Sequence, residues 1–197
     1  MNRIATIDEL ETLYGAASDA ALRKVTTRLN EPYRRMLEAS PFVAVATGTG
    51  DGFDCSPRGD RNQVAFVLDE RSIAIPDRRG NNRLDTLRNI VADGRIALLF
   101  LLPGRDECLR VNGTAFLTTD LNERFAVDGK APASVIVVEI AKVYFQCARA
   151  IMRSGLWNGP VAKDLPTPGE MIKAAFADFD AETYERERPA RQEETLY

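Results

Sequence analysis

Residues 72–92 read SIAIPDRRGNNRLDTLRNIVA: a short apolar strand, a polar loop and an amphipathic segment in that order. Four apolar side chains of the last part recur at helical spacing: Leu84, Leu87, Ile90 and Val91. The loop ends in Asn81 and Asn82, and asparagine is a frequent helix N-cap residue. We therefore predict a strand at 72–76 and a helix that begins at about Asn82.

Strand patterns lie on both sides of this helix. Short runs of apolar and β-branched residues predict strands at 42–47, 54–59, 64–68, 72–76, 96–102, 108–118 and 134–147. Gly113 interrupts the sixth of these runs and predicts a β-bulge. Six or more short strands, with one helix inserted after the fourth, indicate a mainly β protein with helices (α+β class). We expect a closed or nearly closed β-barrel with helices at its rim.

Helical patterns occupy both ends of the chain. Thr6 and Glu9 have the spacing of a capping box, which predicts a helix that ends at Gly15. Further helices are expected at 20–29, 32–39, 120–126, 147–156 and 167–179. Residues 182–194 are dense in both charge signs and predict a frayed or solvated tail. We divide the chain into a barrel domain with its N-terminal helices, 1–160, and a C-terminal helix with a charged tail, 161–197.

The composition excludes several classes of function. The 197 residues include 26 Lys plus Arg, 29 Asp plus Glu and no His, so the net charge is −3. This balance predicts no nucleic-acid or membrane partner. Without histidine there is no Ser-His-Asp or Cys-His catalysis, and three cysteines without a CxxC pair predict no metal site. No apolar run is long enough to span a bilayer, and we expect a soluble, cytoplasmic protein.

The loop between the strand and the helix concentrates groups that bind anions. Within six residues, 78–83, it holds three arginines and two asparagines. The first N–H groups of a helix attract negative charge, and arginine forks match phosphate oxygens. The segment therefore predicts a site for a phosphate monoester, and the alternative is a solvated basic loop.

A preceding segment, CSPRGD at 55–60, contains Arg58. If its strand lies beside the 72–76 strand, Ser56 or Arg58 points into the same anion site. The alternative is an arginine at a hairpin edge that pairs with Asp54 or Asp60.

A third segment follows the last predicted strand. Arg149 and Arg153 share one helix face, and Trp157, the only tryptophan, comes directly afterwards. Two interpretations remain open for Trp157, namely stacking on a planar ligand and packing at an interface.

In their order along the chain, these motifs resemble the FMN-binding split-barrel family related to pyridoxamine 5′-phosphate oxidase. The likeness is closest to its bacterial subgroup of FMN-dependent flavoproteins, and it runs from about Ile4 to Asn158. It rests on SPRG (56–59), PDRRGNNRLDTL (76–87), VNG (111–113) and the segment from VYFQCARA to Leu156-Trp157 (143–157). The string from Asp77 to Arg83 is the most specific part.

The resemblance implies a homodimer with two FMN molecules, each in a cleft between the subunits. By position, Arg58, Asn82 and Arg83 would hold the phosphate, and Arg78 and Asn81 would flank them. Pro76 and Asp77 would line the flavin ring. Trp157 would approach the cofactor from the other subunit.

The implied function is an oxidoreductase that transfers hydride between FMN and a small-molecule substrate or electron donor. The true oxidase holds its substrate phosphate with an Arg-x-His pair, which this chain lacks, so we do not expect pyridoxamine phosphate oxidation. The alternatives are a non-catalytic module that binds or stores flavin, and a related barrel that uses a deazaflavin. No side chain is a strong general base; Asp54 and Tyr144 are the candidates.

Overall fold

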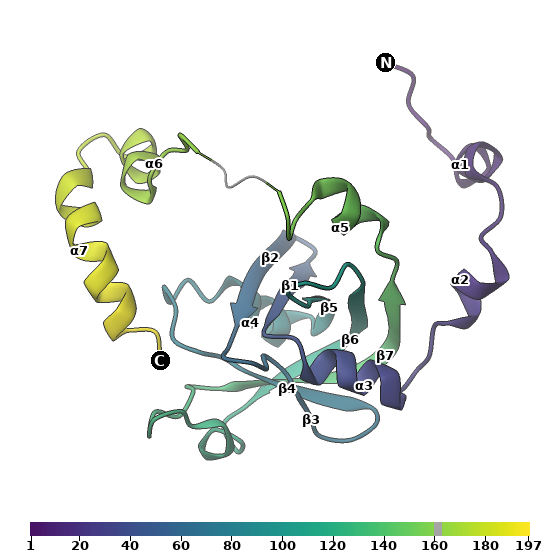
Figure 1. Cartoon of the computed structure of the whole chain (residues 1–197), viewed down its shortest axis with the longest axis horizontal. Coiled ribbons are helices and arrows are strands. Elements are labelled where there is room, and N and C mark those ends of the chain that lie inside the picture. The colour runs from purple at the N-terminus through teal and green to yellow at the C-terminus, as the bar shows by residue number, and fades with distance from the viewer. Residues whose placement is uncertain (160–162) are drawn as a thin grey trace.

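A computed structural model of the chain describes residues 1–159 and 163–197. Seven antiparallel strands form one sheet in the order β2-β1-β5-β6-β7-β4-β3 (Figure 1). The strands are β1 (Phe42–Thr49), β2 (Gly52–Gly59), β3 (Phe66–Val67), β4 (Ser72–Pro76), β5 (Arg95–Leu101), β6 (Cys108–Thr118) and β7 (Val135–Gln146). The strands and helices agree with the predicted α+β class. In the part of the chain that the structure describes, β2 and β3 are the edges and no strand pairing joins them.

The helix that follows β4 is α4 (Asp85–Ala92), and it packs mainly on β1, with smaller contacts to β2, β5 and β6. It therefore sits where the sequence predicts an inserted helix, after the fourth strand. Its buried side chains are Thr86 and Ile90. The loop that precedes it lies near the end of β2, because Asp77 and Arg78 of the loop pair with Arg58 and Asp60 there.

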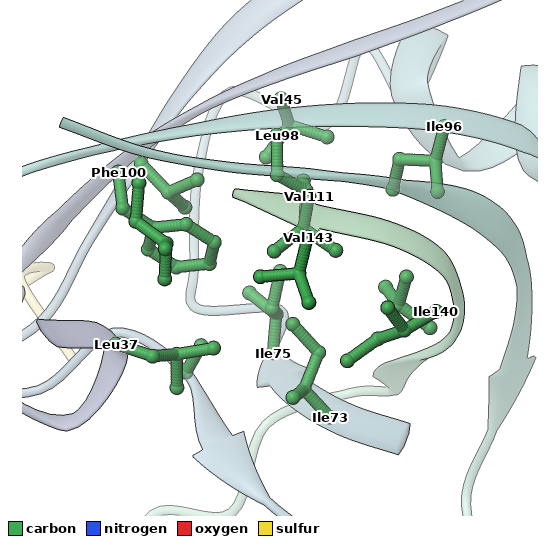
Figure 2. Close-up of a cluster of buried hydrophobic side chains, with 14 of the residues drawn as sticks. Leu37, Val45, Ile73, Ile75, Ile96, Leu98, Phe100, Val111, Ile140 and Val143 are labelled. Atoms are coloured by element: carbon green, nitrogen blue, oxygen red, sulfur yellow. The ribbon is translucent and has the colours of Figure 1, made fainter. Parts of the chain in front are cut away.

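The core lies inside the curved sheet, where side chains from β1, β4, β5, β6 and β7 converge (Figure 2). Strand β5 alternates strictly, with Ile96, Leu98 and Phe100 buried and their neighbours exposed or half-exposed. This period of two is what a strand with one face on the core requires. Leu37 of α3 (Glu31–Glu38) is fully buried against these strands.

The sequence predicts a bulge at Gly113, and the structure has one at this position, but the extra residue is Ala141 on the neighbouring strand β7. The register of β6 on β7 shifts between Asn112 and Gly113. A Cβ atom at Gly113 would overlap with the backbone carbonyl of Glu139 on β7, so the two strands can approach here only because the side chain is absent.

The N-terminal helices confirm two predictions and correct one. Helix α1 (Ile7–Tyr14) has the capping box of Thr6 and Glu9 and ends at Gly15, and α3 carries proline in its first turn as expected. Helix α2 (Asp19–Arg23) is much shorter than the predicted 20–29. The chain leaves the helix because Thr26 makes a bridge to Val143 of β7, and its N–H donates to the Val143 carbonyl at 3.0 Å.

The remaining helices are α5 (Arg149–Ser154), α6 (Pro168–Ala175) and α7 (Ala181–Glu194), with one 3₁₀ turn at Glu123–Phe125 in place of the helix predicted at 120–126. Helix α6 ends before Phe176, which is extended, so the predicted apolar stripe does not continue to Phe179 on one helix. The predicted break at 157–160 and the boundary between 160 and 161 fall partly on residues outside the described ones.

Helix α7 corrects the prediction of a frayed tail. Asp180 caps it by accepting a hydrogen bond from the Thr183 N–H at 3.0 Å, and Glu185 pairs with Arg188 at 3.0 Å. No residue of α7 is buried, so the charged segment is solvated yet helical. Oppositely charged residues three or four positions apart stabilise a helix by a few tenths of a kcal/mol each, which the charge density alone does not reveal.

Two properties apply to the whole of the described chain. None of the helices among residues 1–159 and 163–197 combines the length and apolar character needed to cross a bilayer. Over the same residues there is no group of three or more His, Cys, Asp or Glu side chains arranged to hold a metal ion.

Candidate functional site

The loop from Asp77 to Leu84 is anchored at its start by Arg78. The Arg78 guanidinium donates from Nε to the Asp60 carboxylate at 2.7 Å and from Nη1 to the carbonyl of Phe125 at 2.6 Å. The side chains of Arg78 and Asp60 are only 12% and 7% exposed. Arg78 therefore ties the loop to the end of β2 and to the β6–β7 connection, and two of its donors serve the protein itself.

Arg58, at the end of β2, is a half-buried cation beside the same loop, with its side chain 21% exposed. Its Nε lies 3.2 Å from the Asp77 carboxylate, and its Nη1 donates to the carbonyl of Pro57 at 3.0 Å. It pairs with neither Asp54 nor Asp60, the partners considered from sequence. The Nε–H is not aligned with the Asp77 oxygen, and this buried donor has no hydrogen-bond partner. The Asp77 carboxylate still neutralises the charge of Arg58, so an acceptor from a ligand would complete the hydrogen bonding of a donor that is already ion-paired.

Asp77 is held in a partly dry environment. Burial raises the pKa of its carboxyl above the ordinary value of 3.8, and the neighbouring Arg58 only partly opposes that shift. The side chain is 16% exposed. The ion pair and the burial therefore act in opposite directions on the same group.

The raised pKa of Asp77 makes the stability of the ligand-free protein depend on pH. The folded carboxyl binds its proton more tightly than the unfolded one, so its contribution to the free energy of unfolding is lost as the pH rises through the folded pKa. We expect wild type to lose stability relative to Asp77→Asn as the pH rises from about 4 towards about 7. Denaturant titrations of both proteins across this range measure the difference. A gain in wild-type stability relative to Asp77→Asn over the same pH range would mean that Arg58 governs the pKa instead.

The backbone after Asp77 differs from the prediction at the helix start. Asn82 and Leu84 adopt left-handed conformations, with φ of 58° and 63°, and the helix begins only at Asp85. Asn81 and Asn82 do not cap it; the Asn81 side chain instead accepts from the Arg83 N–H at 3.1 Å. A left-handed backbone conformation costs a leucine about 1–2 kcal/mol, and such strained residues are frequent at functional sites.

This backbone geometry leaves α4 without a side-chain cap. Its first N–H groups carry the positive end of the helix dipole. Left-handed residues next to right-handed ones turn successive N–H groups to one side, an arrangement that binds anions. The strand-to-helix junction is therefore suited to an anion, although its asparagines act through the backbone turn and not as caps.

Arg83 is the most exposed of the predicted phosphate-binding residues. Its side chain is 75% exposed, and Nε donates to Asp85 at 2.8 Å. That contact raises the pKa of the guanidinium, so Arg83 stays charged. Its position at the rim leaves it free to turn towards a ligand at little cost.

Below Arg83, hydroxyl groups surround Asp54. Thr86 of α4 donates to the Asp54 carboxylate at 2.6 Å, and Ser56 donates to it at 3.0 Å. The side chain of Thr86 is buried. The three side chains connect β2 to α4, and two donors already occupy Asp54, which weakens its candidacy as a general base.

Hollows lie on the two sides of the loop. One has a volume of about 270 Å³, and it is lined by six of the eight predicted cofactor residues: Arg58, Pro76, Asp77, Arg78, Asn81 and Asn82. The second, about 370 Å³, is lined by the loop together with Lys130, Ala131, Pro132, Ala133, Ser134 and Tyr197. Arg83 lines a third hollow beside Arg58, of about 300 Å³. Volumes of this order suit a small-molecule site.

The structure does not bring Trp157 to these hollows within one protomer. Its indole N–H donates to the carbonyl of Arg105 in the β5–β6 connection at 2.7 Å. Conversely, sequence reasoning missed Lys130, Leu196 and Tyr197, which line the hollows beside the loop. No local pattern marks these residues, because they reach the loop only through the folded chain.

A family model described as pyridoxamine 5′-phosphate oxidase matches residues 29–147, which span β1 to β7. The chain belongs to the pyridoxamine 5′-phosphate oxidase family. The match includes the Arg58 strand and the whole loop from Asp77 to Leu84, and it ends before Trp157. A search of curated proteins returned no match.

Several solved structures share part of this chain's path at low sequence identity. HupZ from Group A Streptococcus superposes with a TM-score of 0.49 at 16% identity, covering 59% of this chain and 98% of HupZ. A putative pyridoxamine 5′-phosphate oxidase from Lactobacillus delbrueckii gives 0.47 at 21%, covering 60% and 95%. General Stress Protein 26 from Bacillus anthracis gives 0.44 at 14%, covering 58% and 91%. The family assignment rests on the sequence match.

Proposed function

We propose that the chain binds FMN without a covalent link and acts as an FMN-dependent oxidoreductase on a small molecule. The observation that carries this proposal is the buried Nε of Arg58, which has no acceptor and stands beside hollows that the predicted cofactor residues line. An anionic, planar ligand of this size fits both the charge and the volume. Family membership supports flavin as the ligand class.

Each residue has a separate part in holding the cofactor. Arg58 and Arg83 supply charged donors to the phosphate, and the uncapped start of α4 adds backbone N–H groups. Arg78 fixes the loop through Asp60, so that Pro76 and Asp77 stay in place beside the ring. A bound flavin would supply the hydride chemistry, and the protein would orient it and exclude water.

We also propose that the protein works as a homodimer whose flavin sites lie between the subunits. On β5, the outward residues Ala97 and Leu99 are exposed in the middle of the sheet, and the facing residues of β1 are Ala46 and Ala44. An exposed apolar face of small residues on central strands lets the same face of a second copy of the chain pack closely against it. In this arrangement Trp157 of the partner subunit would complete the flavin cleft.

The cofactor is tested by the purified protein itself. We expect a yellow protein with flavin absorbance that releases FMN, identified by its mass, when it is denatured. A released deazaflavin, or a colourless protein that does not take up added FMN, would overturn the proposal.

Turnover needs a second measurement on the FMN-loaded protein. Anaerobic mixing with NADH or NADPH is expected to bleach the flavin absorbance, followed by reoxidation when an acceptor is added. Flavin that stays oxidised with every reductant would favour a storage or binding module over an oxidoreductase. Pyridoxamine 5′-phosphate is not expected to be a substrate, because the chain contains no histidine.

A further inference from the structure

The segment that follows α7 returns to the candidate site from the far end of the chain. Tyr197 lies 137 positions from Asp60, yet its hydroxyl donates to the Asp60 carboxylate at 2.7 Å. The same hydroxyl accepts from the Arg61 N–H at 3.3 Å. Figure 1 shows this chain end beside the barrel, while α6 and α7 lie further out.

Tyr197 is also held from the opposite side. Its backbone oxygen accepts from Lys130 Nζ at 3.0 Å. The guanidinium groups of Arg61 and Arg78 lie 5.1 Å and 5.6 Å from the centre of its ring. The segment 60–61 and Arg78 therefore hold the hydroxyl and the ring, and Lys130 holds the backbone.

These contacts place two residues on the walls of the site. Tyr197 lines the larger hollow and Leu196 lines the smaller one, on the two sides of the Asp77–Leu84 loop. Tyr197 stands at the wall and leaves the hollow open. An aromatic ring at the side of a cleft for a planar ligand adds contact area that the loop, with its glycine and asparagines, does not offer.

Asp60 couples this segment to the loop. Its nearly buried carboxylate, 7% exposed, accepts from both Arg78 and Tyr197. Hydrogen bonds to a buried charge are stronger than neutral ones. The Asp60 carboxylate therefore holds both Arg78, which anchors the loop, and Tyr197, which lies beside it. Helix α7 itself buries no residue, and the segment is thus held mainly through its last side chains.

We propose that Tyr197 is a binding residue of the ligand site, and that residues 195–197 form a strap that closes over a planar, anionic ligand and slows its release. The proposal rests on the FMN-binding function above, with Lys130 adding positive charge beside the ring. The strap opens when the contacts to Asp60, Arg61 and Lys130 break, which requires no rearrangement of the barrel core.

The test compares FMN release from wild type, Tyr197→Ala and Tyr197→Phe, with Tyr14→Ala as the matched control. Tyr14 is 77% exposed on α1 and makes no contact with the hollows. After dilution into buffer without FMN, the loss of bound flavin absorbance gives the release rate. We expect Tyr197→Ala to release FMN roughly tenfold faster, because it loses both the aromatic contact and the hydrogen bond to Asp60.

The phenylalanine variant distinguishes the contribution of the ring from that of the hydrogen bond to Asp60. Tyr197→Phe keeps the ring and loses the bond to Asp60, and it should release FMN about threefold faster, between wild type and Tyr197→Ala. A cooperative thermal unfolding transition of each variant without FMN would confirm that it is folded, since bound ligand itself raises the midpoint.

The outcomes distinguish the two proposals. If Tyr197→Ala and wild type bind FMN and release it at one rate, the strap is wrong and FMN binding stands. If Tyr14→Ala releases FMN as fast as Tyr197→Ala, the effect is not local and the strap is also wrong. If wild type binds no FMN at all, the proposed function fails and the strap fails with it.

Discussion

Replacing Arg58 by alanine is expected to abolish FMN retention, with a loss of about 3 kcal/mol or roughly a hundredfold in affinity. Among residues 1–159 and 163–197, the substitution removes the one buried side-chain donor without a well-formed hydrogen bond, and it also leaves Asp77 without its cation. Equilibrium titration with FMN, followed by flavin fluorescence, measures the dissociation constant.

Two companion variants test the reason for that loss. Arg58→Lys keeps a positive charge beside Asp77 but lacks the planar fork, so it should fold like wild type and still bind FMN weakly. Arg83→Ala should cost only about 1.5 kcal/mol, because its side chain is 75% exposed and works at the rim. If Arg58→Ala binds as tightly as wild type, Arg58 does not hold the cofactor.

Gly113→Ala is expected to destabilise the protein by about 3 kcal/mol or more, the largest single effect on the fold. The added methyl group would overlap with the carbonyl of Glu139, which is backbone and cannot rotate away. The two strands would have to separate at the bulge on β7, which would disturb the β6–β7 pairing that continues on both sides. Chemical denaturation monitored by Trp157 fluorescence measures the free energy of unfolding.

Gly50→Ala provides the control for Gly113→Ala. Gly50 lies in the turn between β1 and β2, its φ is outside the left-handed region, and a Cβ there meets open space. We expect a change within about 0.5 kcal/mol for this variant. A loss of the same size in both variants would mean that close approach at the bulge is not the cause.

Predictions from local signals were the most accurate ones. The capping box at Thr6 marked the start of α1, and the predicted helix start at 167 agrees with α6, because a cap needs only residues within one turn. The bounds of β6 agreed with the alternation at 108–118 to the residue. The position of the bulge was also predicted at Gly113, although the extra residue, Ala141, is on the partner strand.

The errors occurred where distant contacts compete with local preference. Helix α2 ends early because residues beyond Lys24 pair with β7, and the sequence of 20–29 contains no trace of that pairing. The asparagines before α4 suggested caps, but Leu84 occupies the N-cap position in a left-handed conformation. The Asp77–Leu84 loop is tied at its start by Arg78, whose partners Asp60 and Phe125 come from other parts of the chain.

What the sequence by itself determined is the order of strands and helices, the family and the chemical character of the loop, because periodicity, caps and residue types act over a few positions. Only the tertiary structure decided which charges meet. It paired Arg58 with Asp77 and left its Nε without an acceptor, and it brought Tyr197 to Asp60 across 137 positions. Such contacts depend on how the sheet curves and where the chain returns, and no local pattern encodes either.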